Sequence, residues 1–73
     1  MADVPFPRFL SVDDVADELA GSRGVVYSTL KSGLLPGIQV GPKNIWRVER
    51  RVLEEYIEQQ YAATRERVER GEI

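Results

Sequence analysis

The sequence predicts a small, mainly α-helical domain with one β-hairpin, its elements following the order helix, helix, strand, strand, helix. Two capped amphipathic segments separated by a tight turn predict the first two helices. Two β-rich runs joined by a Gly- and Pro-containing connection predict the hairpin, and a long amphipathic segment near the end predicts the last helix. A chain of 73 residues has room for one small core, so a single domain is expected.

The first helix is predicted from Val12 to about Ala20. Ser11 is a suitable N-cap, and Asp14, three residues later, can complete a capping box with it. Gly21 is expected to break the helix. One face of the segment is apolar at helical spacing, and it consists of Val12, Val15, Ala16 and Leu19.

The second helix is predicted to begin after Ser22, which can cap it, and to stop at Gly33. Val26 and Leu30, four residues apart, form its inward stripe. Because a turn of about three residues separates these two short helices, the pair is expected to form a helix-turn-helix.

The hairpin is predicted from the β-prone runs Ile38–Val40 and Ile45–Val48, joined by Gly41–Asn44. In the second strand, Trp46 lies on the face opposite to Arg47. A two-stranded hairpin is only marginally stable alone, so Trp46 is expected to anchor it to the helices rather than to stack on a base.

The third helix is predicted to start at about Arg50. Its apolar side consists of Val52, Leu53, Tyr56, Ile57 and Tyr61, and the stripe fades beyond that point. We therefore expect three regions in the chain. They are a disordered N-terminal arm at residues 1–8, the folded domain at residues 9–61, and a helical extension or frayed tail at residues 62–73.

The amino-acid composition excludes most kinds of catalytic site. The chain has no Cys and no His, which excludes disulfides, thiolate and imidazole catalysis, and the usual zinc sites. No apolar run approaches the roughly 20 residues of a membrane helix, and the N-terminus carries Asp3 where a signal peptide would carry positive charge. We expect a cytoplasmic protein without enzymatic activity, cofactor, small-molecule ligand or membrane contact.

The first helix carries four acidic residues, Asp13, Asp14, Asp17 and Glu18. They are expected to cap the helix or face solvent rather than bind metal.

The charge is unevenly distributed along the chain. A net charge of −2 argues against nucleic-acid binding, because affinity for phosphate depends on basic groups that displace counterions. However, six of the ten Lys and Arg residues lie between Arg23 and Arg51, where Glu49 is the single acid. The flanking segments are acidic. This basic middle segment is compatible with phosphate binding, and ordinary variation along a charged surface is the alternative interpretation.

Several short motifs occur in an ordered series between Phe9 and Ile57. They are Leu10-Ser11-Val12, Val15-Ala16 with Leu19, Ser22-Arg23 with Val26-Tyr27, Ser32-Gly33-Leu34-Leu35-Pro36, Val40-Gly41, Trp46-Arg47-Val48 and Leu53-Glu54-Glu55-Tyr56-Ile57. In this series the chain resembles the small MerR-like helix-turn-helix domain of phage excisionases and short bacterial regulators. The resemblance implies a winged helix-turn-helix whose second helix enters the DNA major groove and whose hairpin wing touches the adjacent backbone or minor groove. It also implies a bacterial or phage-derived protein that is nucleoid-associated when bound.

The outward face of the second helix and the wing form the expected DNA-binding surface. The predicted contact residues are Arg23, Gly24, Tyr27, Ser28 and Lys31 on the helix, Lys43 and Arg47 on the wing, and Arg50 and Arg51 at the start of the third helix. Tyr27 can instead pack its ring beside Leu30 or Trp46. For Arg50 and Arg51, pairing with Glu54 and Glu55 is an equal alternative.

The chain departs from the family pattern at a few positions. Relatives commonly carry a small polar residue in place of Gly24 and Thr in place of Val25, and they often show paired arginines at the wing tip where this chain has only Lys43. Base readout is therefore expected to be weak, with phosphate contact and DNA shape contributing more.

These observations predict a double-stranded DNA-binding protein that is a small transcriptional regulator or an excisionase-type architectural factor. Because one such domain covers few base pairs, head-to-tail self-association on DNA is expected. The alternative is a protein-interaction module that keeps the fold but binds another protein through its acidic flanks.

Overall fold

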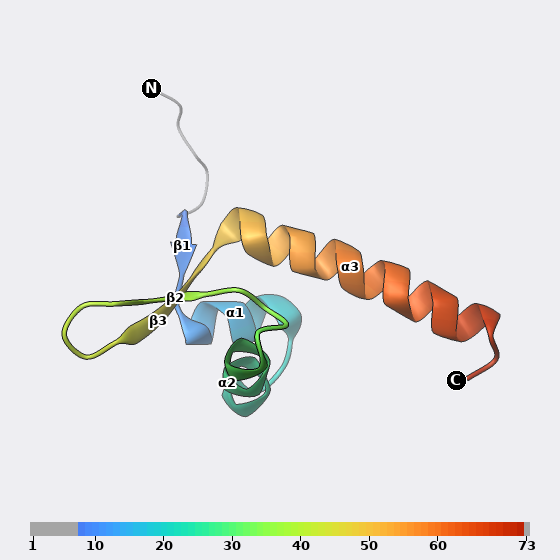
Figure 1. The fold of residues 1–73 in the computed structure, drawn as a ribbon, viewed down its shortest axis with the longest axis horizontal. Helices are drawn as coiled ribbons and strands as arrows, with labels where there is room; N and C mark the ends of the chain where they lie inside the picture. Colours follow the sequence, from blue (N-terminus) through green and yellow to red (C-terminus); the bar gives the residue numbers. More distant parts are fainter. Residues whose placement is uncertain (1–7, 73) are drawn as a thin grey trace, which may run out of the picture.

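Three helices and three short strands make up the computed structural model, which describes residues 8–72 (Figure 1). In chain order the elements are β1 (Phe9–Leu10), α1 (Val12–Leu19), α2 (Arg23–Ser32), β2 (Ile38–Val40), β3 (Ile45–Glu49) and α3 (Arg50–Glu69). The predicted fold class is confirmed: the protein is mainly helical, with a β-hairpin wing beside a helix-turn-helix. The wing consists of residues 38–49, which are β2, β3 and the turn between them.

The predicted capping box of α1 is present. The Asp14 backbone N–H donates to Ser11 Oγ and the Ser11 backbone N–H donates to the Asp14 carboxylate, each at 3.1 Å. The expected stop at Gly21 is displaced by one residue, because Ala20 adopts the left-handed conformation with φ 55°. The N–H of Ala20 donates to the carbonyl of Asp17, and that of Gly21 to the carbonyl of Ala16. These two bonds form a Schellman motif. Here the left-handed residue is Ala20, and Gly21 is the residue that follows it.

Both predicted ends of α2 are confirmed. Ser22 Oγ accepts from the backbone N–H of Val25 at 3.2 Å. Gly33 ends the helix with φ 84°, a left-handed conformation that a residue without Cβ adopts at little cost, and its N–H donates to Leu30. The short turn between α1 and α2 therefore has a hydrogen-bonded helix end on each side.

The sheet has the antiparallel order β1-β3-β2. The predicted hairpin is present, with Ile38 opposite Arg47 and Val40 opposite Ile45. The first strand was not predicted, because two residues are too short for a periodic pattern to appear in the sequence. It pairs Leu10 with Val48 and so supports the base of the wing from the other edge of β3.

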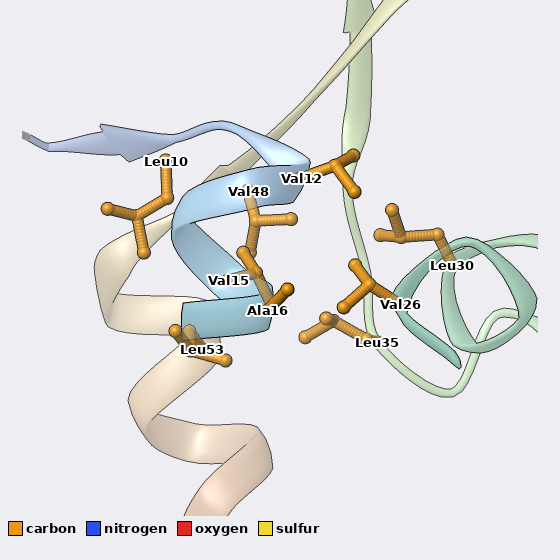
Figure 2. Close-up of a cluster of buried hydrophobic side chains, with 9 residues drawn as sticks. All are labelled: Leu10, Val12, Val15, Ala16, Val26, Leu30, Leu35, Val48 and Leu53. Carbon is orange, nitrogen blue, oxygen red and sulfur yellow. The ribbon is translucent and has the colours of Figure 1, made fainter. Parts of the chain in front are cut away.

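Among residues 8–72, nine buried side chains form a core between α1, α2, the sheet and the start of α3 (Figure 2). They are Leu10, Val12, Val15, Ala16, Val26, Leu30, Leu35, Val48 and Leu53. Trp46 packs against this core and stays partly exposed, which confirms that it anchors the wing to the helices. Leu35 has no exposed surface, and its burial was not predicted from the sequence. The two leucines between Gly33 and Pro36 are too short a run to give a periodic signal.

The last helix leads away from the rest of the molecule (Figure 1). Within its described length Leu53 is the buried residue, whereas Tyr61 is 69% exposed. In the described part of residues 62–73, α3 continues to Glu69. Most of the predicted N-terminal arm, residues 1–7, lies outside the described residues. Arg8 is described, and it forms an ion pair with Glu49 at 3.0 Å.

The burial of Leu35 gives a stability prediction with a neighbouring control. We expect Leu35→Ala to lower the free energy of unfolding by about 2–5 kcal/mol, because it removes apolar contacts and leaves a cavity. A domain of this size has about 3–5 kcal/mol in total, so much of the variant should be unfolded. Leu34→Ala, at a side chain that is 68% exposed, should change stability by no more than about 0.5 kcal/mol. Urea denaturation followed by circular dichroism measures both, and equal midpoints would contradict the packing described.

Candidate nucleic-acid interface

A cleft of about 380 Å³ separates the outer side of α2 from the wing. Its walls come from three elements that are distant in the sequence: the start of α1, the first turns of α2, and the wing from its tip to the middle of β3. The lining residues are Ser11, Val12, Asp13, Arg23, Tyr27, Lys43, Asn44, Ile45, Trp46 and Arg47. The structure therefore brings together four of the predicted contact residues, namely Arg23, Tyr27, Lys43 and Arg47.

The orientation of α2 agrees with the prediction. Val26 and Leu30 are buried, which leaves Gly24, Ser28 and Lys31 exposed on the outer face. A Cβ placed on Gly24 would meet nothing nearer than Ser22 Oγ at 3.9 Å, so the backbone of this first turn is open to close approach. Tyr27 is partly buried and packs against the core, so it contributes to the stability of the fold. It also lines the cleft.

Arg23 is held in place by two contacts. Its Nε lies 2.9 Å from Asp13 Oδ1, and its guanidinium carbon lies 5.9 Å from the centre of the Tyr27 ring. Sequence reasoning missed the contact with Asp13, which was expected to be a solvated residue of the first helical turn. No sequence signal identifies the pair, because the two residues lie on different helices and meet only through the angle between α1 and α2.

The wing presents its basic residues in two different ways. Lys43 is exposed at the tip, whereas Arg47 is partly buried and its Nη1 donates to the Trp46 carbonyl at 2.8 Å. The turn is closed by a hydrogen bond from the Asn44 N–H to the Gly41 carbonyl at 3.1 Å. Both turn residues have positive φ, a conformation that Gly and Asn adopt more readily than other residues. The tip that carries Lys43 is therefore defined by turn chemistry.

The two arginines at the start of α3 lie outside the cleft. Arg50 is 15% exposed and lies 3.6 Å from carboxylate oxygens of both Glu18 and Glu54, so it joins α1 to α3. Arg51 pairs with Glu55 at 3.1 Å and with Glu49 at 3.4 Å. The expected pairings with Glu54 and Glu55 are thus present, while contact of either arginine with DNA stays a prediction.

Other kinds of site are not visible in the part of the chain that the structure describes. Within residues 8–72 no group of three or more acidic side chains is placed to hold a metal ion. None of the described helices is both long and apolar enough to cross a membrane. The acids of α1 instead have local roles, such as Asp14 in the capping box and Glu18 beside Arg50.

A helix-turn-helix whose second helix shares a basic cleft with a β-hairpin defines the winged helix-turn-helix class of DNA-binding proteins. The family model described as "Helix-turn-helix domain" matches residues 9–61, which is most of the chain, and the protein belongs to this family. It is therefore a DNA-binding helix-turn-helix protein, and the resemblance predicted from the sequence is confirmed. Comparisons with curated proteins and with solved structures find no match.

The position of the wing depends on a close approach at Gly37. A Cβ there would lie 2.7 Å from Leu30 Cδ2 and 3.3 Å from the Arg47 carbonyl oxygen. Because that oxygen belongs to the backbone of β3, we expect Gly37→Ala to shift the wing and to cost about 1–3 kcal/mol of stability. It should also weaken DNA binding, since the two walls of the cleft no longer match.

Gly21→Ala is the control for this prediction, because a Cβ at Gly21 would meet nothing within 4 Å and its φ is not positive. Thermal melting and gel-shift titration of both variants test the prediction. An alanine at Gly37 that leaves melting temperature and affinity unchanged would show that the wing position does not depend on this contact.

Proposed function

We propose that the protein is a small transcriptional regulator or an excisionase-type architectural factor that acts on double-stranded DNA by binding alone. In this proposal α2 enters the major groove and the wing lies on the adjacent backbone or minor groove. The observation that carries it is the cleft, which brings Arg23 of α2 together with Lys43 and Arg47 of the wing. Since its target is DNA, we place its action in the bacterial cytoplasm, on the nucleoid.

On α2, the proposal gives each exposed residue a role that suits its chemistry. Arg23, near the helix start, reaches guanine or phosphate, and Gly24 allows close approach of the backbone. Ser28 and Lys31 are exposed further along the same face and suit phosphates or base edges. The Tyr27 hydroxyl reaches phosphate while the ring stays against the core.

On the wing, Lys43 and Arg47 contact phosphate. Lys43 is exposed at the tip, and the partly buried Arg47 donates a hydrogen bond to the Trp46 carbonyl. Arg50 and Arg51 contribute little in this arrangement, because carboxylates already neutralise them within the protein. The footprint then consists of four basic side chains: Arg23, Lys31, Lys43 and Arg47.

The salt dependence of binding tests this footprint. With Arg23 on a base, the other three basic side chains neutralise three phosphates, so log K should fall against log salt with a slope of about −3. If all six basic residues of the middle segment contacted phosphate, the slope would be about −5. Lys43→Ala should weaken binding to every duplex by the same factor and reduce the slope by about 0.9, because it removes one phosphate contact. Gel-shift or fluorescence titrations over a range of salt concentrations provide the measurement.

Arg65→Ala is the matched control, since it removes the same charge from the α3 extension, outside the cleft. Its slope should equal that of the unmodified protein. A flat salt response, or failure to bind heparin and random duplex DNA at low salt, would favour the alternative of a protein-interaction module.

The proposal includes head-to-tail assembly on DNA. Acidic residues are exposed on α1 and α3, while the wing tip is basic, so the flank of one copy complements the wing of the next. Such a contact joins two different surfaces and does not close on itself, so it propagates along the duplex. Screened surface pairs contribute only about 0–1 kcal/mol each, but binding to the same DNA raises the effective concentration of neighbouring copies.

We therefore expect free protein to be monomeric at micromolar concentration and to bind a long duplex in cooperative steps. Sedimentation of the protein alone and gel-shift titration on a duplex with room for several copies test this. A stable dimer in solution that occupies one palindromic site would overturn the assembly proposal and leave DNA binding itself intact.

A further inference from the structure

We propose that Asp13 is a positioning residue that sets the sequence preference of Arg23. It holds the guanidinium over the cleft in an orientation suited to a base edge, and it opposes the approach of phosphate to the same place. This inference rests on the proposed DNA-binding function and assigns within it a role to an acidic residue. Such a role is unexpected on a DNA-binding surface, because a carboxylate repels the phosphate backbone.

The position of the contact on Arg23 decides which donors stay free. Asp13 Oδ1 meets Arg23 at Nε, at 2.9 Å, and both residues line the cleft. Within the described residues Arg23 forms an ion pair with no other carboxylate, and the contact with Asp13 is at Nε rather than at a terminal nitrogen. Guanine is read by a bidentate contact with O6 and N7, which needs two neighbouring donors of one guanidinium. The nearest contact of Asp13 is thus with the nitrogen that this bidentate contact does not require.

The Tyr27 ring limits the guanidinium on a second side. The Arg23 guanidinium carbon lies 5.9 Å from the ring centre, within the range of a cation–π contact. The ring itself packs against the core, so it provides a fixed reference for the arginine. With one nitrogen near Asp13 and the guanidinium beside Tyr27, these two contacts favour one orientation of Arg23 over those that follow a nearby phosphate.

Electrostatics makes the effect of Asp13 on binding smaller for the preferred duplex than for other duplexes. Its side chain is 69% exposed in the free protein, where water screens it and the ion pair contributes little to stability. On DNA the cleft is partly closed to water, and the carboxylate repels phosphate on every sequence. A guanine within reach of the Arg23 donors offsets this repulsion, and other bases do not. Asp13 thus weakens binding to all duplexes and weakens it least on the preferred one.

The local structure of α1 does not require Asp13. The capping box uses Ser11 and Asp14, and an additional acid in the first turn contributes only about 0.3–1 kcal/mol through the helix dipole. Asp13→Asn should therefore fold. Asp17→Asn is the matched control, because Asp17 is also exposed on α1 and loses the same charge, but it does not line the cleft.

The experiment first selects a preferred duplex from a random library with the unmodified protein, using DNA short enough for one copy. Dissociation constants are then measured on this duplex and on a scrambled one, at several salt concentrations. Asp13→Asn should bind scrambled DNA about tenfold more tightly, with a salt slope steeper by about 0.9, because the released Arg23 now reaches a phosphate. The preference for the selected duplex should fall about tenfold. Asp17→Asn should tighten binding to both duplexes by one small common factor and keep the preference.

A second variant separates positioning from net charge. Arg23→Lys keeps the positive charge but lacks the forked donors, so it should lose the preference, and adding Asp13→Asn to it should change the preference no further. If Asp13→Asn and Asp17→Asn change the preference for the selected duplex equally, this inference is overturned and DNA binding is not. It is also overturned if the melting temperature of Asp13→Asn falls so far that partial unfolding explains its loss of preference. Failure of the unmodified protein to bind any duplex would overturn the proposed function, and the inference with it.

Discussion

The structure depends on the packing of β3. This strand pairs with β2 along the wing and with β1 at the wing's base, it buries Val48 completely, and it continues directly into α3 at Arg50. An isolated hairpin is only marginally stable, so the wing needs both the third strand and the core contact of Trp46 to hold its position. If β3 were released, the wing, the start of α3 and one wall of the cleft would lose their common support.

The core is small, and this explains how the DNA-facing surface remains free. α2 is attached by Val26 and Leu30, and Leu35 completes the packing from the loop after the helix. Gly24, Ser28 and Lys31, on the opposite face, stay exposed. Gly37 then lets the chain pass close to Leu30 before the wing begins. With stability of only about 3–5 kcal/mol available to such a domain, each of these contacts matters for function as well as for folding.

The distribution of ion pairs explains how an acidic protein can bind DNA. Carboxylates neutralise Arg8, Arg50 and Arg51 at the base of the wing and on α3. Within the described residues no ion pair involves Lys31 or Lys43, which lie at the end of α2 and at the wing tip. The net charge of −2 therefore describes the whole molecule but not the surface beside the cleft. In our proposal Asp13 is the exception, an acid retained within that surface to orient Arg23.

Features that depend on neighbouring residues could be predicted from the sequence. The caps at Ser11 and Ser22, the end of α2 at Gly33, the hairpin turn and the inward stripe of α2 all result from local hydrogen bonding or helical spacing, and the outward face of α2 was predicted with them. Features that depend on distant residues were decided only by the tertiary structure. Strand β1 exists because β3 offers it an edge, Leu35 is buried because the loop returns to the core, and Asp13 meets Arg23 because α1 and α2 cross at that point. A sequence pattern records periodicity and capping within one segment, whereas these contacts depend on the angle and distance between segments.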